Sequence, residues 1–152
     1  MAGCRRGFAT LAPAFGPEGP AGLMDTLVAI HSLLRWIVLL AALAALGVGI
    51  SSWVGAGGSE KLARQAMLAY AVAFDAQVLL GVVLWLRGNF LQYGDRFIRL
   101  EHPTIMLLAL AIVHVAAARA RRSGAPVDAA RLRTIGAAVS LALILVGIPW
   151  QR

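Results

Sequence analysis

The sequence predicts an all-α integral membrane protein that folds as an antiparallel four-helix bundle. Of its 152 residues, 60% are hydrophobic and only 14% are charged, and the mean hydropathy is +0.78. The charges gather between four long apolar stretches, and about 20 apolar residues in a helix cross the hydrocarbon core of a bilayer. Each stretch is continuous, whereas the strands of a membrane barrel alternate over about 10 residues.

The first 23 residues differ from the rest of the chain. Arg5 and Arg6 precede a stretch rich in proline and glycine, without the apolar core of a signal peptide. We expect residues 1–23 to be a disordered tail or an upstream extension that is not translated. Residues 24–152 then form the transmembrane domain.

The first two spans are separated by a short glycine-rich loop. The first is predicted at about residues 27–53 and the second at about 62–86, with three glycines in residues 54–59 between them. Residues 87–101 form the longest connection, which is polar but contains several aromatic residues. That composition is typical of a segment in the membrane interface.

The third span is predicted at about residues 103–119, because Pro103 suits the first position of a helix, where its missing N–H has no partner to lose. A polar loop with Gly124 and Pro126 follows. The fourth span is predicted at about residues 132–150.

The basic residues predict the orientation. One side carries seven of them in its two connections: Lys61, Arg64, Arg119, Arg121, Arg122, Arg131 and Arg133. The opposite connection carries three: Arg87, Arg96 and Arg99. The positive-inside rule therefore predicts a multi-pass protein of the bacterial cytoplasmic membrane with both termini outside. The net charge of +7 is explained by lipid contact and topology, and no nucleic-acid partner is expected.

Polar side chains within the spans are the candidates for function, because such groups are costly in hydrocarbon. His31 and Arg35 are four residues apart on the first span and share a helix face, which small residues continue inward. Small residues allow close helix contact, so His31 is expected to face protein. His102 lies at the N-terminal end of the third span, on the same side of the membrane as His31.

Two imidazoles on opposed helices are the usual axial pair of a b-type haem. His31 and His102 are therefore candidate ligands of a haem iron, with Arg35 and Arg99 as partners of the propionates. Three acids could accept the second ring N–H of these histidines: Asp25, Asp95 or Glu101. The structural alternative is that His102 caps the third helix and that His31 forms hydrogen bonds within a polar cluster.

Asp75 and His114 lie at matching depths near the middle of the second and third spans. They could form a clasp between the two helices, a proton relay or a quinone contact. Gln77 points about 200° away from Asp75 around its helix and is expected to meet another helix.

Four motifs resemble a group of small bacterial four-helix membrane proteins labelled cytochrome b-like. They are His31-Ser-Leu-Leu-Arg-Trp36, Phe74-Asp-Ala-Gln77 with Gly81, Glu101-His-Pro-Thr-Ile-Met106 and Ile148-Pro-Trp150. The resemblance covers residues 24–152 and implies a b-haem or quinone-linked electron-transfer role, with His31 and His102 as the matching histidines. Some members carry a histidine where this chain has Asp75, so a ligand scheme that uses that position does not apply here.

The leading hypothesis is a b-type haem-binding membrane subunit for electron transfer, with quinone as a candidate second cofactor. One alternative is an accessory subunit of a larger membrane complex, in which the polar residues only lock helices together. A third is a proton-coupled carrier that uses Asp75 and His114. An electron-transfer or accessory subunit is favoured over a stand-alone enzyme, because no nucleophile, base and acid converge at one depth.

Overall fold

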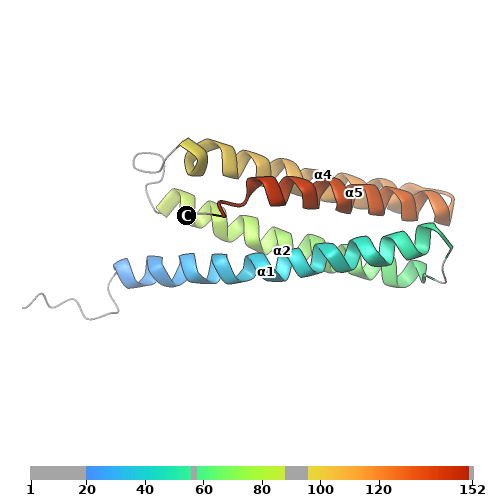
Figure 1. Ribbon diagram of the computed structural model, residues 1–152, viewed down its shortest axis with the longest axis horizontal. Helices are drawn as coiled ribbons and strands as arrows, with labels where there is room; N and C mark the ends of the chain where they lie inside the picture. The colour runs from blue at the N-terminus through green and yellow to red at the C-terminus, as the bar shows by residue number, and fades with distance from the viewer. Residues whose placement is uncertain (1–19, 56–57, 88–95, 151–152) are drawn as a thin grey trace, which may run out of the picture.

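The computed structural model describes residues 20–55, 58–87 and 96–150, and within them it contains helices and no strand (Figure 1). Four long helices and one short π-helix follow each other: α1 (Pro20–Trp53), α2 (Glu60–Arg87), η1 (Phe97–Glu101), α4 (His102–Arg122) and α5 (Pro126–Gly147). The long helices run antiparallel to their neighbours in sequence. The prediction of an all-α antiparallel four-helix bundle is confirmed.

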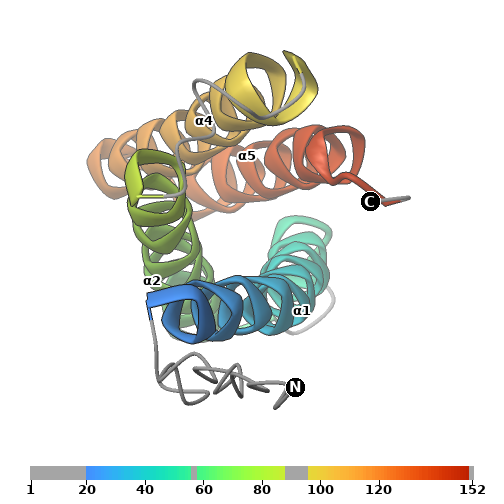
Figure 2. The ribbon, with the colours of Figure 1, turned by 90° about the vertical axis from the view of Figure 1, so that its left-hand side faces the viewer.

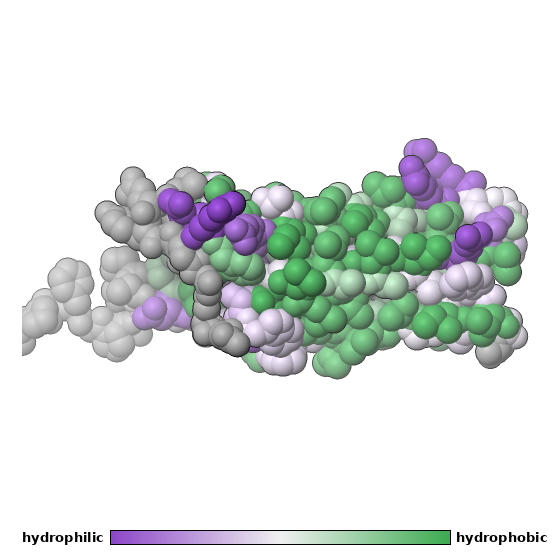
Figure 3. All heavy atoms as spheres, turned by 45° about the horizontal axis from the view of Figure 1, so that its top comes forward, coloured by the Kyte–Doolittle hydropathy of each residue, from purple (hydrophilic) through white to green (hydrophobic). Residues whose placement is uncertain are grey.

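All four long helices are long and apolar enough to cross a membrane. α4 is the shortest, and its 21 residues make it about 32 Å long, which matches the thickness of the hydrocarbon core. On the face shown in Figure 3, apolar residues form a band between polar residues at the two ends. The chain is therefore a multi-pass membrane protein whose apolar helix surfaces contact lipid.

α1 pairs with α2 and α4 pairs with α5, and α1 and α4 lie on opposite sides of the bundle (Figure 2). α1 packs against α2 and α5, and α4 packs against the same two helices from the other side. Side chains that point inward from α1 and α4 can therefore face each other through the core.

Small residues bring the helices into close contact. Ala42, Ala109 and Ala137 are completely buried, and a Cβ added to Gly136 would collide with the Cβ of Ala116 on α4. The interior also contains Ser140, whose hydroxyl donates to the carbonyl of Ala109 at 3.0 Å. Such packing is typical of membrane bundles, where lipid is as apolar as the core and close fit has to hold the helices together.

Two helices begin earlier than the sequence patterns indicate. α1 begins at Pro20, so residues 20–23 of the expected tail are helical, while residues 1–19 lie outside the described part of the chain. α5 begins at Pro126 rather than near residue 132, and most of the predicted loop before it is helical. The reason is local: Pro126 occupies the first turn, where proline is favoured, and Asp128 complements the helix dipole there.

The third membrane helix also begins earlier than predicted. The N–H of His102 donates to the carbonyl of Phe97, five residues back, so η1 leads directly into α4. Pro103 has no N–H for the Arg99 carbonyl, and this carbonyl instead accepts a hydrogen bond from the Trp85 indole at 3.0 Å. His102 therefore lies within a continuous helical segment and does not cap its end. Of the predicted interfacial connection, residues 88–95 lie outside the described residues.

Candidate functional site

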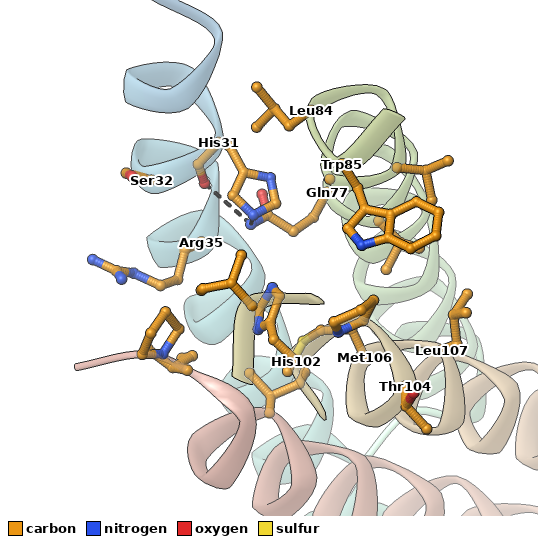
Figure 4. A pocket seen from close by; sticks show the side chains of 18 of the residues that line it. His31, Ser32, Arg35, Gln77, Leu84, Trp85, His102, Thr104, Met106 and Leu107 are labelled. Atoms are coloured by element: carbon orange, nitrogen blue, oxygen red, sulfur yellow. Dashed lines mark hydrogen bonds between the residues drawn. The ribbon is translucent and has the colours of Figure 1, made fainter. Parts of the chain in front are cut away.

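A cavity of 540 Å³ lies inside the bundle, near the end where α1 and α4 begin and α2 and α5 finish (Figure 4). Its wall is mostly apolar, with residues from all four helices such as Val38, Phe74, Leu84, Met106 and Ile144. A few polar side chains interrupt this wall: His31, Ser32, Arg35, Gln77, Arg99, His102 and Thr104. An apolar cavity of this size with a few polar groups is the usual form of a cofactor or small-molecule site.

His31 enters the cavity from α1 and is held by Gln77 of α2. The Gln77 amide nitrogen donates to the main-chain carbonyl of His31 at 3.1 Å and lies 3.2 Å from the His31 Nε2. An amide nitrogen can only donate, so Nε2 is the acceptor and the ring proton is on Nδ1. The opposite amide orientation would set the Gln77 oxygen against the His31 carbonyl. The contacts therefore assign the Nδ1–H tautomer to His31.

The tight packing at His31 depends on Gly81, one turn beyond Gln77 on α2. A Cβ at Gly81 would lie 3.1 Å from the His31 Cε1, closer than ordinary van der Waals contact. The glycine therefore leaves room for the Cε1 edge of the imidazole beside α2.

His102 enters the cavity from α4, and α5 fixes its ring. Its Nδ1 lies 2.7 Å from the carbonyl oxygen of Gly147 in the last turn of α5. The last carbonyls of a helix have no partner within the helix, so Gly147 is free to accept. A carbonyl cannot donate, so the Nδ1 carries the proton and the Nε2 keeps its lone pair in the neutral ring. The acids expected for this role do not fill it: Glu101 pairs with Arg96 at 3.3 Å, Asp25 is exposed, and Asp95 lies outside the described residues.

The two imidazoles lie close together across the bundle. Their ring centroids are 6.5 Å apart and their planes are inclined at 79°. A transition metal binds an imidazole nitrogen at about 2 Å, so two rings on opposite sides of one metal ion have centroids roughly 6 Å apart. The observed separation is of this size, but the His31 Nε2 lies against the Gln77 amide, so the His31 ring would have to turn before this nitrogen could bind a metal.

The number of ligands suits haem better than a bare metal ion. Among the described residues, no three His, Cys, Asp or Glu side chains gather in a group that could hold a metal. Haem iron takes four nitrogens from its own macrocycle and needs only one or two side chains from the protein. His31 and His102 match that requirement.

Arg35 and Arg99, the predicted partners of the propionates, both line the cavity. The guanidinium of Arg35 lies 5.2 Å from the Trp36 ring and 6.0 Å from the Trp150 ring, and it points away from the imidazoles in Figure 4. Its Nε is buried without a hydrogen-bond partner among the described residues, so it can still donate to an anionic group. Arg99 contributes its carbonyl to the Trp85 indole, as described above.

The structure brings Asp75 and His114 together, but outside the cavity. The His114 Nε2 lies 2.8 Å from the Asp75 Oδ1, and the two side chains are 51% and 42% exposed on the outer surface of α4 and α2. This contact joins the two helices on the lipid side of the bundle. Neither of the two residues lines the His31–His102 cavity.

Sequence reasoning missed the role of Gln77 and Gly147 at the site. Gln77 was expected to meet another helix, and it does so on the face it shares with Gly81. Matching depths could have placed it beside His31, since Gln77 is 10 residues from the end of α2 at Arg87 and His31 is 11 residues from the start of α1 at Pro20. The late predicted start of the first span concealed this match. No signal in the sequence pointed to the Gly147 carbonyl.

Comparison with family models, curated proteins and solved structures finds no match for this chain. The resemblance to cytochrome b-like proteins therefore stays a prediction.

Proposed function

We propose that the chain is a b-type haem-binding membrane subunit for electron transfer, in which His31 and His102 would hold the haem iron. The observation that carries the proposal is the pair of imidazoles, which enter one apolar cavity from opposite helices with their centroids 6.5 Å apart. Haem in such a site supplies one-electron redox chemistry.

The hydrogen bonds around the rings support this role. Gly147 orients His102 with its proton on Nδ1, and a main-chain carbonyl that accepts from the second ring nitrogen fixes the tautomer and the ring orientation of a ligating histidine. Gln77 places the proton of His31 on Nδ1 as well, so both Nε2 atoms carry lone pairs. When the His31 Nε2 turns to a ligand, Gln77 keeps its second hydrogen bond to the His31 carbonyl.

The rest of the cavity supports binding of a large, mostly apolar group with anionic substituents. The wall is mostly aliphatic and aromatic, and Arg35 and Arg99 provide cationic groups for propionates at the edge of the cavity. We place this end of the bundle toward the outside of a bacterial cytoplasmic membrane, because the opposite end carries more basic residues.

A visible difference spectrum of the detergent-purified protein, dithionite-reduced minus oxidised, tests the proposal. We expect a b-type band in the wild type that is lost in His31→Ala and in His102→Ala. His114→Gln is the matched control, because the third histidine lies outside the cavity and should leave the band unchanged. Absence of the band after expression with ample haem, or its survival in both cavity variants, would contradict the proposal.

A second candidate function is the binding of a quinone in the same cavity. Two buried atoms favour it: the His31 Nδ1 and the Gln77 Oε1 have no hydrogen-bond partner among the described residues. They offer one donor and one acceptor beside an apolar wall, as a quinone or quinol head group requires. The distinguishing result is binding of a short-chain quinone analogue by haem-free protein, weakened about tenfold or more in Gln77→Leu.

A further inference from the structure

The end of the bundle opposite the histidine cavity contains a second hollow, of 410 Å³. It lies between the start of α2, the end of α4, the short connection 123–125 and the first turn of α5. The apolar part of each helix finishes here, so the hollow is at the level where lipid head groups lie. We define the residues that carry the argument as the arginine pocket: Glu60, Arg64, Arg121 and Arg133.

Arg133 and Glu60 form the inner wall of the arginine pocket and neutralise each other. The guanidinium of Arg133 makes two parallel contacts with the Glu60 carboxylate, Nη1 to Oε2 at 2.9 Å and Nη2 to Oε1 at 2.8 Å. The Arg133 side chain is only 5% exposed. Paired in this way, a buried arginine is fixed in position and its charge is balanced.

Arg64 and Arg121 leave the arginine pocket with an unbalanced positive charge. They come from different helices, α2 and α4, and both are exposed beside the same hollow. Among the described residues that line the hollow, Glu60 is the only acid, and Arg133 already binds it. Three guanidinium groups and one carboxylate give the lining a net charge of +2.

The first turn of α5 adds to the attraction for an anion. Ala125, Pro126 and Ala129 line the hollow, and the N-cap residue Ala125 makes no side-chain hydrogen bond to the helix. The start of α5 therefore faces the hollow without a capping side chain, beside the two arginines, although the Asp128 carboxylate in the same turn offsets part of the positive helix dipole.

We propose that the arginine pocket binds the phosphate of an anionic phospholipid head group, with Arg64 and Arg121 as its ligands. Guanidinium groups bind phosphate oxygens through charge-assisted hydrogen bonds, and basic pockets at the ends of transmembrane helices suit phospholipid head groups. Free inorganic phosphate has the same chemistry, but head-group phosphates are concentrated at this depth while the acyl chains can lie along the apolar helix surface.

Thermal unfolding of the full-length protein in neutral detergent, with added phosphatidylglycerol or phosphatidylcholine, tests the proposal. We expect phosphatidylglycerol to raise the Tm and phosphatidylcholine to leave it unchanged. In Arg64→Gln/Arg121→Gln, the apparent affinity for phosphatidylglycerol should fall roughly 25-fold, at about fivefold for each arginine. Both residues are exposed and form no ion pair with a described residue, so this variant should fold normally.

Arg122→Gln/Arg131→Gln is the matched control, because it removes the same charge from the same end of the bundle without touching the arginine pocket. It should keep the response of the wild type. An equal loss of affinity in both double variants would show general attraction to the basic end and overturn the proposal, as would a wild type that does not respond. An equal Tm shift with inorganic phosphate at the same concentration would contradict the claim that the bound phosphate belongs to a phospholipid.

Discussion

The His102 imidazole and the Gly147 carbonyl are joined by a 2.7 Å hydrogen bond that connects the start of α4 with the last turn of α5. Gly147 is close to α4 as well, since a Cβ at this position would collide with Met106 and lie 2.8 Å from the Cγ2 of Ile105. The acceptor is therefore held against α4 by packing, and the orientation of the histidine ring follows from the contact between two helices.

The first prediction concerns the tautomers of the cavity histidines. In the haem-free protein, neutral His102 and neutral His31 should both carry the ring proton on Nδ1. The Gly147 carbonyl faces the Nδ1 of His102, and the Gln77 amide N–H faces the Nε2 of His31. Nitrogen-15 NMR of histidine-labelled protein distinguishes protonated from unprotonated ring nitrogens. A proton found on the Nε2 of His102 would contradict the assigned hydrogen bond.

A second prediction concerns the lipid-facing pair of Asp75 and His114. We expect a double-mutant cycle with Asp75→Leu and His114→Leu to give a coupling free energy of about 0.6–1.7 kcal/mol, between the average and the maximum measured for hydrogen bonds between membrane helices. The double variant should be at least as stable as the wild type, since it removes two polar groups from the lipid surface. Reversible unfolding in mixed micelles measures both values, and strictly additive single effects would show that the 2.8 Å contact contributes nothing.

A third prediction follows from the buried hydroxyl chain in the core. The Ser140 hydroxyl donates to the Ala109 carbonyl, so the Tyr70 hydroxyl is the donor in its own 2.7 Å bond to the Ser140 Oγ. Tyr70→Phe should lower the free energy of unfolding by about 1 kcal/mol, because only one hydrogen bond is lost. Ser140→Ala should cost more, about 1–3 kcal/mol, because the Tyr70 hydroxyl is left buried without an acceptor. Equilibrium unfolding in detergent checks the order, and a larger effect of Tyr70→Phe would reverse the inferred direction of the chain.

A fourth prediction compares two glycines in membrane helices. Gly136→Ala should destabilise the bundle by about 1–3 kcal/mol, because the new methyl collides with Ala116 and forces α5 away from α4. Gly47→Ala is the matched control: nothing lies within 4 Å of its added Cβ, and alanine is the better helix former. The two unfolding curves should therefore shift in opposite directions, and equal shifts would contradict the tight contact at Gly136.

The fold could be predicted because the bilayer imposes it on the sequence. Long apolar stretches and the basic residues between them indicate the number of helices and their alternating direction. The helix ends were less accurate, since hydropathy finds where the apolar part begins and not where the hydrogen bonds begin. At Pro126 and Asp128, local preferences extend the helix well into the polar region.

The histidine pair could be suspected from sequence because His31 and His102 lie on the same side of the membrane. Their ring orientations could not be predicted from sequence. The His102 ring depends on Gly147, 45 residues away along the chain, and the His31 ring depends on Gln77, 46 residues away. Main-chain acceptors carry no sequence signature. The exposed position of Asp75 and His114 was also hidden, because matching depths indicate contact without saying which side of the bundle it occupies.

The π-turn before His102 has a consequence for chain length. A π-turn accommodates one residue more than an α-helical turn, so deleting Leu100 would let the segment relax into a regular α-helix. The residues before the deletion would then rotate by about 100° relative to His102. The Arg99 carbonyl would leave the Trp85 indole, while His102 and its bond to Gly147 would stay in place. Deletion of this one residue would thus remove the Arg99–Trp85 contact at the edge of the cavity and leave the orientation of His102 unchanged.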